Sequence, residues 1–200
     1  MKRIILATRN IGKIRELSAL LADLSLELKS LLDYPDAPEV LEDGDTFYKN
    51  ALKKGRFFAN YTGETVIADD SGLEVDCLNG VPGVYSARYA GPSASDEDNI
   101  EKLLHVLDGV SPDQRTAAFR CVLVLCDPEG NHETFEGILK GVITKERRGS
   151  KGFGYDPVFF YPECGKTVAE LSPEEKNRIS HRGQAFGILK KRLQEQLVSR

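Results

Sequence analysis

Residues 4–21 read IILATRNIGKIRELSALL and predict a strand, a polar turn and a helix in immediate succession. The run 4–7 is apolar and is followed by polar residues, which is typical of a short buried strand. Apolar residues then recur at spacings of three and four over 14–24, the period of a helix, and Asn10 is a suitable N-cap. A helix N-terminus directly after a strand points backbone N–H groups at a bound anion. The segment 8–13 is therefore predicted to be an anion-binding turn.

The rest of the chain alternates helical and strand-like patterns and then adds a hairpin. The expected elements are a helix capped by Thr46 that runs to about Ala59, a short strand at 65–68 that ends at Asp69, a helix capped by Ser95 or Asp96, strands at 116–126 and 133–143 joined by the turn 127–131, and a C-terminal helix. Helices that alternate with strands, followed by a hairpin, indicate an α/β fold with a mixed sheet. We expect one domain over residues 1–200.

Composition excludes several classes of protein. A chain of 200 residues with 40% hydrophobic and 29% charged residues is ordinary for a globular enzyme. The net charge of −4 argues against a general nucleic-acid binder. The four cysteines show no C-x-x-C spacing and there are only three histidines, so a zinc site is not expected. The N-terminal apolar stretch is too short for a signal sequence or a membrane span, and we expect a cytoplasmic protein with no membrane partner.

Acidic residues form the second group of candidate functional residues. Asp69 and Asp70 are adjacent at the end of an apolar strand, a costly placement unless a cation or solvent compensates. Mg²⁺ takes carboxylates, waters and phosphate oxygens, so Glu42 and the aspartate pair are candidate ligands, and one carboxylate could orient or deprotonate water. Neighbouring strand residues point to opposite faces, which predicts different roles for the two aspartates. The alternative is a solvated turn.

Three further polar residues belong to the same part of the sequence. Ser71 follows the acidic pair and is a candidate hydroxyl donor to substrate rather than a nucleophile, because metal-assisted attack by water needs no covalent step. On the helix expected after Thr46, Asn50 and Lys53 are three residues apart and share a face.

A third group, near the C-terminus, offers contacts suited to a purine base. Phe153 lies between two glycines, where its ring could stack on a base. Asp156, Lys176 and the run Ser180-His181-Arg182 offer hydrogen bonds, and an arginine suits the O6 acceptor of inosine while disfavouring the amino group of adenine. The alternatives are a core phenylalanine and a surface His-Arg pair.

In their order and spacing, these blocks resemble the inosine triphosphate pyrophosphatase family, from about Leu6 to Ala185. The matching blocks are TRNIGK at 8–13, EDGDTF at 42–47, DDSGL at 69–73, FGYD at 153–156 and SHR at 180–182. The resemblance implies hydrolysis of ITP, dITP and XTP to the monophosphate and pyrophosphate, a two-lobed α/β fold with a cleft between the lobes, Mg²⁺ as cofactor and a homodimer.

The resemblance also implies a role for each matching residue. It assigns Asp70 as the proton acceptor and as a metal-site residue. The other expected metal ligands are Glu42 and Asp69. The expected substrate-binding residues are Thr8, Arg9, Asn10, Ile11, Gly12, Lys13, Ser71, Phe153, Gly154, Tyr155, Asp156, Lys176, His181 and Arg182.

Three other functions remain open from the sequence. One is a related pyrophosphatase that acts on modified pyrimidine or methylated nucleotides. Another is a nucleotide-binding module without catalysis, which would be expected to lack one of the three acidic residues that this chain retains. The third is an RNA-binding protein that uses the basic loop 145–148, which the acidic net charge disfavours.

Overall fold

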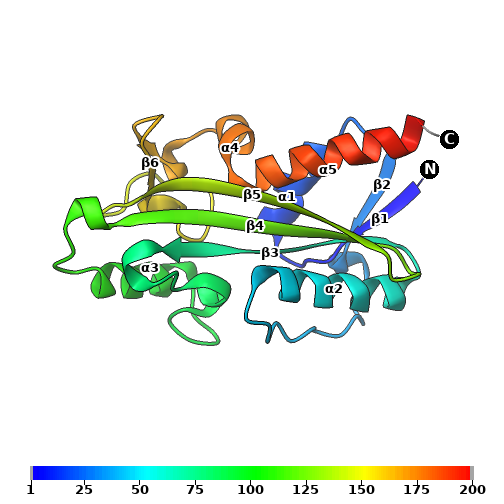
Figure 1. The fold of residues 1–200 in the computed structure, drawn as a ribbon, viewed down its shortest axis with the longest axis horizontal. Coiled ribbons are helices and arrows are strands. Elements are labelled where there is room, and N and C mark those ends of the chain that lie inside the picture. The colour runs from blue at the N-terminus through cyan, green and yellow to red at the C-terminus, as the bar shows by residue number, and fades with distance from the viewer. Residues whose placement is uncertain (1, 199–200) are drawn as a thin grey trace. The chain divides into compact units, whose positions relative to one another are not determined.

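The computed structural model describes residues 2–198, and the side chains of residues 3–196 (Figure 1). The strands are β1 (Lys2–Leu6), β2 (Leu26–Ser30), β3 (Thr65–Val75), β4 (Thr116–Cys126), β5 (His132–Ile143), β6 (Phe159–Tyr161) and β7 (Lys166–Thr167). The helices are α1 (Ile11–Leu21), α2 (Phe47–Thr62), α3 (Asp96–Val106), α4 (Pro173–Ile179) and α5 (His181–Val198). Within this part of the chain, no helix is both long and apolar enough to cross a membrane.

The strands form one mixed sheet in the order β2-β1-β3-β4-β5-β6-β7. β1 pairs in parallel with β2 and with β3, whereas β6 pairs antiparallel with β5 and β7. The predicted fold class, an α/β fold with a mixed sheet flanked by helices, is confirmed. β4 and β5 are neighbours and are joined by the turn 127–131, so the predicted hairpin is also present.

The chain divides into two compact units. The first comprises residues 1–70, 121–137 and 182–200, and the second comprises residues 71–120 and 138–181. The strands β3, β4 and β5 each contribute residues to both units. Two of the divisions, after Asp70 and after His181, fall inside motifs identified in the sequence.

In the first unit, helices cover both faces of the strands. α1 and α5 lie on one face and α2 lies on the other (Figure 1). Leu17 and Leu21 of α1 and Phe186 and Leu189 of α5 pack with strand residues such as Ile67 in one buried cluster. Burial of such side chains stabilises the unit by about 2 kcal/mol each.

On its own face, α2 approaches the strands closely. A Cβ added at Gly55 would lie 3.2 Å from the Sγ of Cys126 and 3.6 Å from the Cβ of Ala68. Because Gly55 has no side chain, α2 can pack closely on the strands, and its polar residues lie near the middle of β3.

The second unit has a core of its own. Ile100, Leu103 and Leu107 from the α3 region pack with buried residues such as Leu73 and Phe159. Ile100, Leu103 and Leu107 are three and four residues apart, so they lie on one face of the helix.

The predicted helix starts are confirmed by hydrogen bonds. Asn10 accepts from the Lys13 N–H, Thr46 from the Lys49 N–H, and Ser95 from the Asp98 N–H. Each bond satisfies one of the backbone donors that a helix N-terminus leaves unpaired.

The predicted end of the third strand is wrong. This strand was expected to cover residues 65–68 and to end at Asp69, and the alternative for the acidic pair was a solvated turn. In the structure β3 continues to Val75, and both Leu73 and Val75 are buried in the second unit. Apolar burial beyond the polar residues outweighs their local preference for a turn.

Candidate active site

Asp69 and Asp70 lie in the middle of β3, and their side chains are only 3% and 6% exposed. The Oδ2 of Asp69 accepts a hydrogen bond of 2.6 Å from the Nζ of Lys13 in α1. The Oδ2 of Asp70 instead accepts one of 2.9 Å from the Nδ2 of Asn50 in α2. Because α1 and α2 cover opposite faces of the strands (Figure 1), the two carboxylates point to opposite faces, as alternation along a strand predicts.

The environment of Asp69 favours its ionised form. Burial alone raises the pKa of this carboxyl, but the charges of Lys13, Lys54 and Arg182 outweigh burial and hold the pKa well below its ordinary value. Asp69 is therefore a fixed negative charge at neutral pH, and it holds the ammonium group of Lys13 in place.

The environment of Asp70 acts in the opposite direction. Burial raises the pKa of Asp70 to about 6; Lys54 opposes this rise and the charge of Glu42 adds to it. At neutral pH such a carboxylate is mostly ionised, yet it is more basic than an ordinary aspartate. Asp70 is therefore suited to accept a proton from water.

Lys54 joins the acidic residues of this unit. It lies on α2 one turn after Asn50, and its Nζ donates to the main-chain oxygen of Asp69 and pairs with Glu42 Oε1, each at 2.5 Å. Burial lowers the pKa of Lys54, but the charges of Asp69, Glu42 and Asp70 outweigh burial, and the net pKa lies above its ordinary value. The lysine is thus a buried cation among carboxylates.

The turn between β1 and α1 is held by its own polar groups. Thr8, Arg9 and Asn10 lie in this turn, whereas Ile11, Gly12 and Lys13 form the first turn of α1. The Oγ1 of Thr8 accepts from the Asn10 N–H at 3.1 Å, and the Oδ1 of Asn10 accepts from the Lys13 N–H at 3.0 Å. The guanidinium of Arg9 donates to the main-chain oxygen of Ala37 at 2.5 Å. The side chain of Arg9 therefore anchors a neighbouring loop, while Lys13 reaches the acidic residues.

The acidic residues fit a cation that phosphate oxygens would help to coordinate. Glu42 lies close enough to Asp70 for its charge to raise the pKa of Asp70. A bound cation would relieve this repulsion between the two carboxylates. No group of three or more His, Cys, Asp or Glu able to hold a metal ion occurs among the residues that the structure describes. Mg²⁺ at nucleotide sites commonly uses one or two carboxylates together with waters and phosphates. Asp69, the third expected ligand, faces Lys13 instead.

In the second unit, three of the predicted base-binding residues contact one another. The Oδ2 of Asp156 accepts from the Nζ of Lys176 at 2.7 Å and from the N–H of Phe153 at 2.9 Å. The same Nζ lies 4.5 Å from the centroid of the Phe153 ring. A Cβ at Gly152, whose φ is +80°, would collide with the carboxylate of Asp156, so this loop conformation requires glycine.

Other predicted residues of the second unit have structural partners. The ring of His181 is buried and stacks on Phe119, with centroids 4.9 Å apart. The hydroxyl of Tyr155 donates to the main-chain oxygen of Ser86 at 2.9 Å, so its side chain stabilises the fold. The N–H of Gly154 donates to the Oδ2 of Asp96 at 2.7 Å. These bonds fix the loop that carries Phe153.

Three residues beside the unit boundaries complete the predicted set. Arg182, the first residue of the first unit's C-terminal part, is buried, and its Nη1 lies 3.5 Å from Glu16 Oε2. Arg182 also helps to lower the pKa of Asp69, so its charge acts on the acidic residues of the first unit. Ser71, directly after Asp70 in β3, is partly buried, and Ser180 is buried at the end of α4.

A model of the Ham1 family matches residues 4–192. The chain belongs to the Ham1 family. It is 57% identical over 193 residues to the dITP/XTP pyrophosphatase of Geobacter sulfurreducens, covering 96% of this chain and 97% of that protein. It is 53% identical to the dITP/XTP pyrophosphatase of Geobacillus kaustophilus, with 98% and 96% covered. The structure of a Ham1 protein from Coxiella burnetii is similar to it with a TM-score of 0.90 and 42% identity, over 98% of this chain and all of that one.

These relatives confirm the family that the motifs indicated. One buried residue of the site, Lys54, was not among those that the sequence predicted. Asn50 and Lys53 were expected to share a helical face, but Lys53 is exposed and pairs with Asp43, while the next residue is the buried one. Helical spacing separates the two lysines, because Lys54 lies seven residues after Phe47 and four before Phe58, on the buried face of α2.

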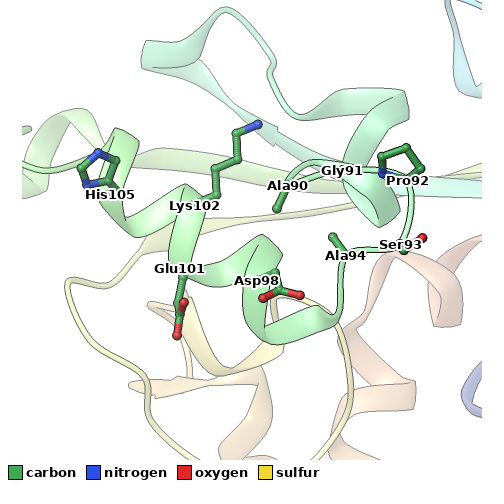
Figure 2. A pocket seen from close by; sticks show the side chains of 9 residues that line it. All are labelled: Ala90, Gly91, Pro92, Ser93, Ala94, Asp98, Glu101, Lys102 and His105. Atoms are coloured by element: carbon green, nitrogen blue, oxygen red, sulfur yellow. The ribbon is translucent and has the colours of Figure 1, made fainter.

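The Ham1-family chain also has a surface depression that contains none of these residues. It has a volume of about 690 Å³ and is lined by Ala90, Gly91, Pro92, Ser93, Ala94, Asp98, Glu101, Lys102 and His105 (Figure 2). The four charged or titratable side chains all come from α3 and are exposed. The Nζ of Lys102 donates to the main-chain oxygen of Tyr89, so the lysine is already paired. This depression is therefore not the candidate active site.

Proposed function

We propose that this Ham1-family chain hydrolyses the non-standard purine nucleoside triphosphates ITP, dITP and XTP to the nucleoside monophosphate and pyrophosphate. The observation that carries the proposal is the buried pair Asp69 and Asp70, with opposite pKa shifts, beside the cations Lys13 and Lys54. The names of the relatives, dITP/XTP pyrophosphatases at 57% and 53% identity, support the substrate class.

The cations and the turn of the first unit bind the triphosphate in this proposal. Lys13 and Lys54 supply positive charge, and the first turn of α1 supplies backbone N–H groups and the positive end of its dipole. Asp69 keeps Lys13 extended toward the phosphates. The metal ligation that the sequence predicts for Asp69 stays a prediction.

Asp70 accepts the proton of the attacking water. The oxygen of that water forms a bond to the α-phosphorus, and the bond from the α-phosphorus to the leaving pyrophosphate breaks. Glu42 and Asp70 would hold Mg²⁺, which when bound supplies positive charge for the phosphate oxygens. Lys54 stabilises the ionised form of Asp70 and pairs with Glu42.

The proposed selection of the base uses five residues, Phe153, Asp156, Lys176, His181 and Arg182. Phe153 stacks on the purine, and Lys176 and Asp156 fix its position. His181 and Arg182 donate hydrogen bonds to the O6 of the purine, where adenine carries an amino group. Donors that face an amino group remain unpaired, which disfavours adenine by about 1–3 kcal/mol for each lost bond.

The cellular role follows from this specificity. The enzyme removes deaminated purine nucleotides before polymerases incorporate them.

In this proposal it acts in the cytoplasm as a homodimer. Cys121 and Cys126 are buried free thiols, which fits a reducing compartment. Light scattering of the purified protein tests the dimer, and a single-subunit mass at micromolar concentration would refute it.

One substrate panel tests the proposed function. ITP, dITP, XTP, ATP, dUTP and methylated triphosphates are each incubated with protein and Mg²⁺, and pyrophosphate is measured. We expect turnover of the first three, and a fall by a factor of about 10² or more in Asp70→Asn. Preference for dUTP or methylated nucleotides would favour the related pyrophosphatase. Tight binding of ITP without pyrophosphate release would favour a non-catalytic module.

A further inference from the structure

Asn50 bonds to two parts of the first unit that carry the candidate carboxylates. It is fully buried, at 0% exposure. Its Oδ1 accepts from the N–H of Gly44 at 2.7 Å, and its Nδ2 donates to the Oδ2 of Asp70 at 2.9 Å. Gly44 lies two residues after Glu42, so one side-chain amide links the segment of Glu42 to Asp70.

The fit between Gly44 and α2 leaves no room for another side chain. A Cβ at Gly44 would lie 2.7 Å from the Oδ1 of Asn50 and 2.9 Å from the Cβ of Lys49. Glycine therefore allows the backbone of this segment to lie directly against the helix. The hydrogen bond to Asn50 then fixes the position of the segment along α2.

Two further contacts hold the same segment to the same helix. Lys54, one turn after Asn50, pairs with Glu42, and Thr46 accepts from the Lys49 N–H to cap α2. Of these contacts, only the one through Asn50 also reaches Asp70. An amide is required there, because the side chain must accept from an N–H and donate to a carboxylate at once.

We propose that Asn50 is a positioning residue that fixes Glu42 and Asp70 relative to each other, so that both carboxylates act on one cation and one water. This inference rests on the proposed function. Side chains that orient metal-binding carboxylates typically change metal affinity or activity by about 10-fold to 100-fold when they are replaced.

Two substitutions separate the acceptor of Asn50 from its donor. Asn50→Asp has the same size and keeps the acceptor for the Gly44 N–H. It loses the donor, which reaches Asp70 at 2.9 Å and the main-chain oxygen of Gly44 at 3.5 Å, whereas Asn50→Ala loses all three bonds. Asn60→Ala and Asn60→Asp, at an exposed position of the same helix, are the matched controls. Because Asn50→Asp preserves shape, it carries the test if Asn50→Ala fails to fold.

Hydrogen exchange in the protein alone tests the link without substrate. The amides of residues 43–46 should exchange faster in Asn50→Ala than in the wild type, and Asn50→Asp should keep most of their protection. Unchanged exchange of this segment in Asn50→Ala would show that Asn50 does not hold it, and would overturn the proposal.

Turnover tests the functional consequence. We expect kcat for ITP to fall by about 10-fold to 100-fold in both Asn50 variants, with little change in KM, and the Mg²⁺ midpoint to rise in Asn50→Ala. Rates like those of the Asn60 controls would overturn the proposal.

A double variant separates positioning from a general loss of stability. If Asn50 acts through Glu42, then Glu42→Gln combined with Asn50→Ala should be little slower than Glu42→Gln alone. Fully additive losses would mean that the two residues act independently, which contradicts positioning.

Failure of the proposed function gives a different result from failure of this inference. The wild type would then release no pyrophosphate from any triphosphate. The exchange experiment would still decide whether Asn50 holds the segment.

Discussion

Two adjacent aspartates show how neighbouring residues acquire opposite properties. Asp69 faces Lys13, and cations hold its pKa down. Asp70 is buried beside Asn50 and Glu42, and its pKa rises to about 6. Alternation along β3 separates their environments, because it points one side chain toward α1 and the next toward α2. The ionised form of Asp70 is therefore destabilised, which makes this carboxylate more basic, as its proposed role requires.

The raised pKa of Asp70 predicts a dependence of stability on pH. Between about pH 4 and pH 6 the folded protein binds more protons at this site than the unfolded chain, so its contribution to stability falls as the pH rises. In metal-free protein, the unfolding free energy of Asp70→Asn minus that of the wild type should therefore grow by about 2 kcal/mol from about pH 4 to pH 7.5. Urea unfolding of both proteins at the two pH values measures this difference. A difference that stays constant with pH would contradict the raised pKa.

Substitutions at the base-reading residues separate recognition of the base from recognition of phosphate. ITP should exceed ATP in kcat/KM by about 10² or more. Arg182→Ala should reduce the efficiency for ITP far more than for ATP, whereas Phe153→Ala should weaken both, because stacking does not depend on the exocyclic group. Steady-state kinetics with the two nucleotides measure both effects. Equal losses for ITP and ATP in Arg182→Ala would instead assign this residue to phosphate, in line with its charge acting on Asp69.

At the scale of elements, the sequence predicted the helix starts better than the end of β3. Caps at Asn10, Thr46 and Ser95 are local hydrogen bonds between residues three apart, so the sequence contains the information. The continuation of β3 through Asp69 and Asp70 depends on burial of Leu73 and Val75, which only the tertiary structure reveals. Lys54 was missed although its spacing from Phe47 and Phe58 places it on the apolar face of α2. Its burial follows from the close approach of α2 to the strands at Gly55.

The loop that carries Phe153 offers a matched test at this scale. Gly152→Ala places a methyl group against the carboxylate of Asp156 at a φ of +80°. This change should displace the groups that bind the base and lower kcat/KM for ITP by about 10²-fold. Gly165→Ala is the control, because Gly165 has a φ of +63° with open space around it and should cost only about 1 kcal/mol of stability. Kinetics of both variants measure the contrast, and similar losses would mean that backbone strain alone is responsible.

At the scale of the whole molecule, each unit supplies a different part of the proposed chemistry. The first unit contains Lys13, Glu42, Lys54 and the aspartate pair, which suit phosphates, a cation and water. The second contains the group formed by Phe153, Asp156 and Lys176, which suits a base. The sequence motifs predicted these residues except Lys54, but their partners within each unit became visible only in the structure.

Metal removal tests the role of the acidic residues in the complete protein. Activity should vanish in EDTA and return with Mg²⁺, whereas Ca²⁺, which prefers a larger and more flexible shell, should support it poorly. Pyrophosphate release from ITP measures each state. Full activity in chelated protein would remove the need for Glu42 and Asp70 as metal ligands.

Hydrolysis of ITP in water labelled with heavy oxygen tests the central claim most directly, that water activated by Asp70 attacks the α-phosphorus. Mass spectrometry of the products locates the label. We predict IMP that carries one labelled oxygen and pyrophosphate that carries none, with the same pattern at a much lower rate in Asp70→Asn. Label in pyrophosphate, or release of inosine diphosphate and inorganic phosphate, would contradict the claim.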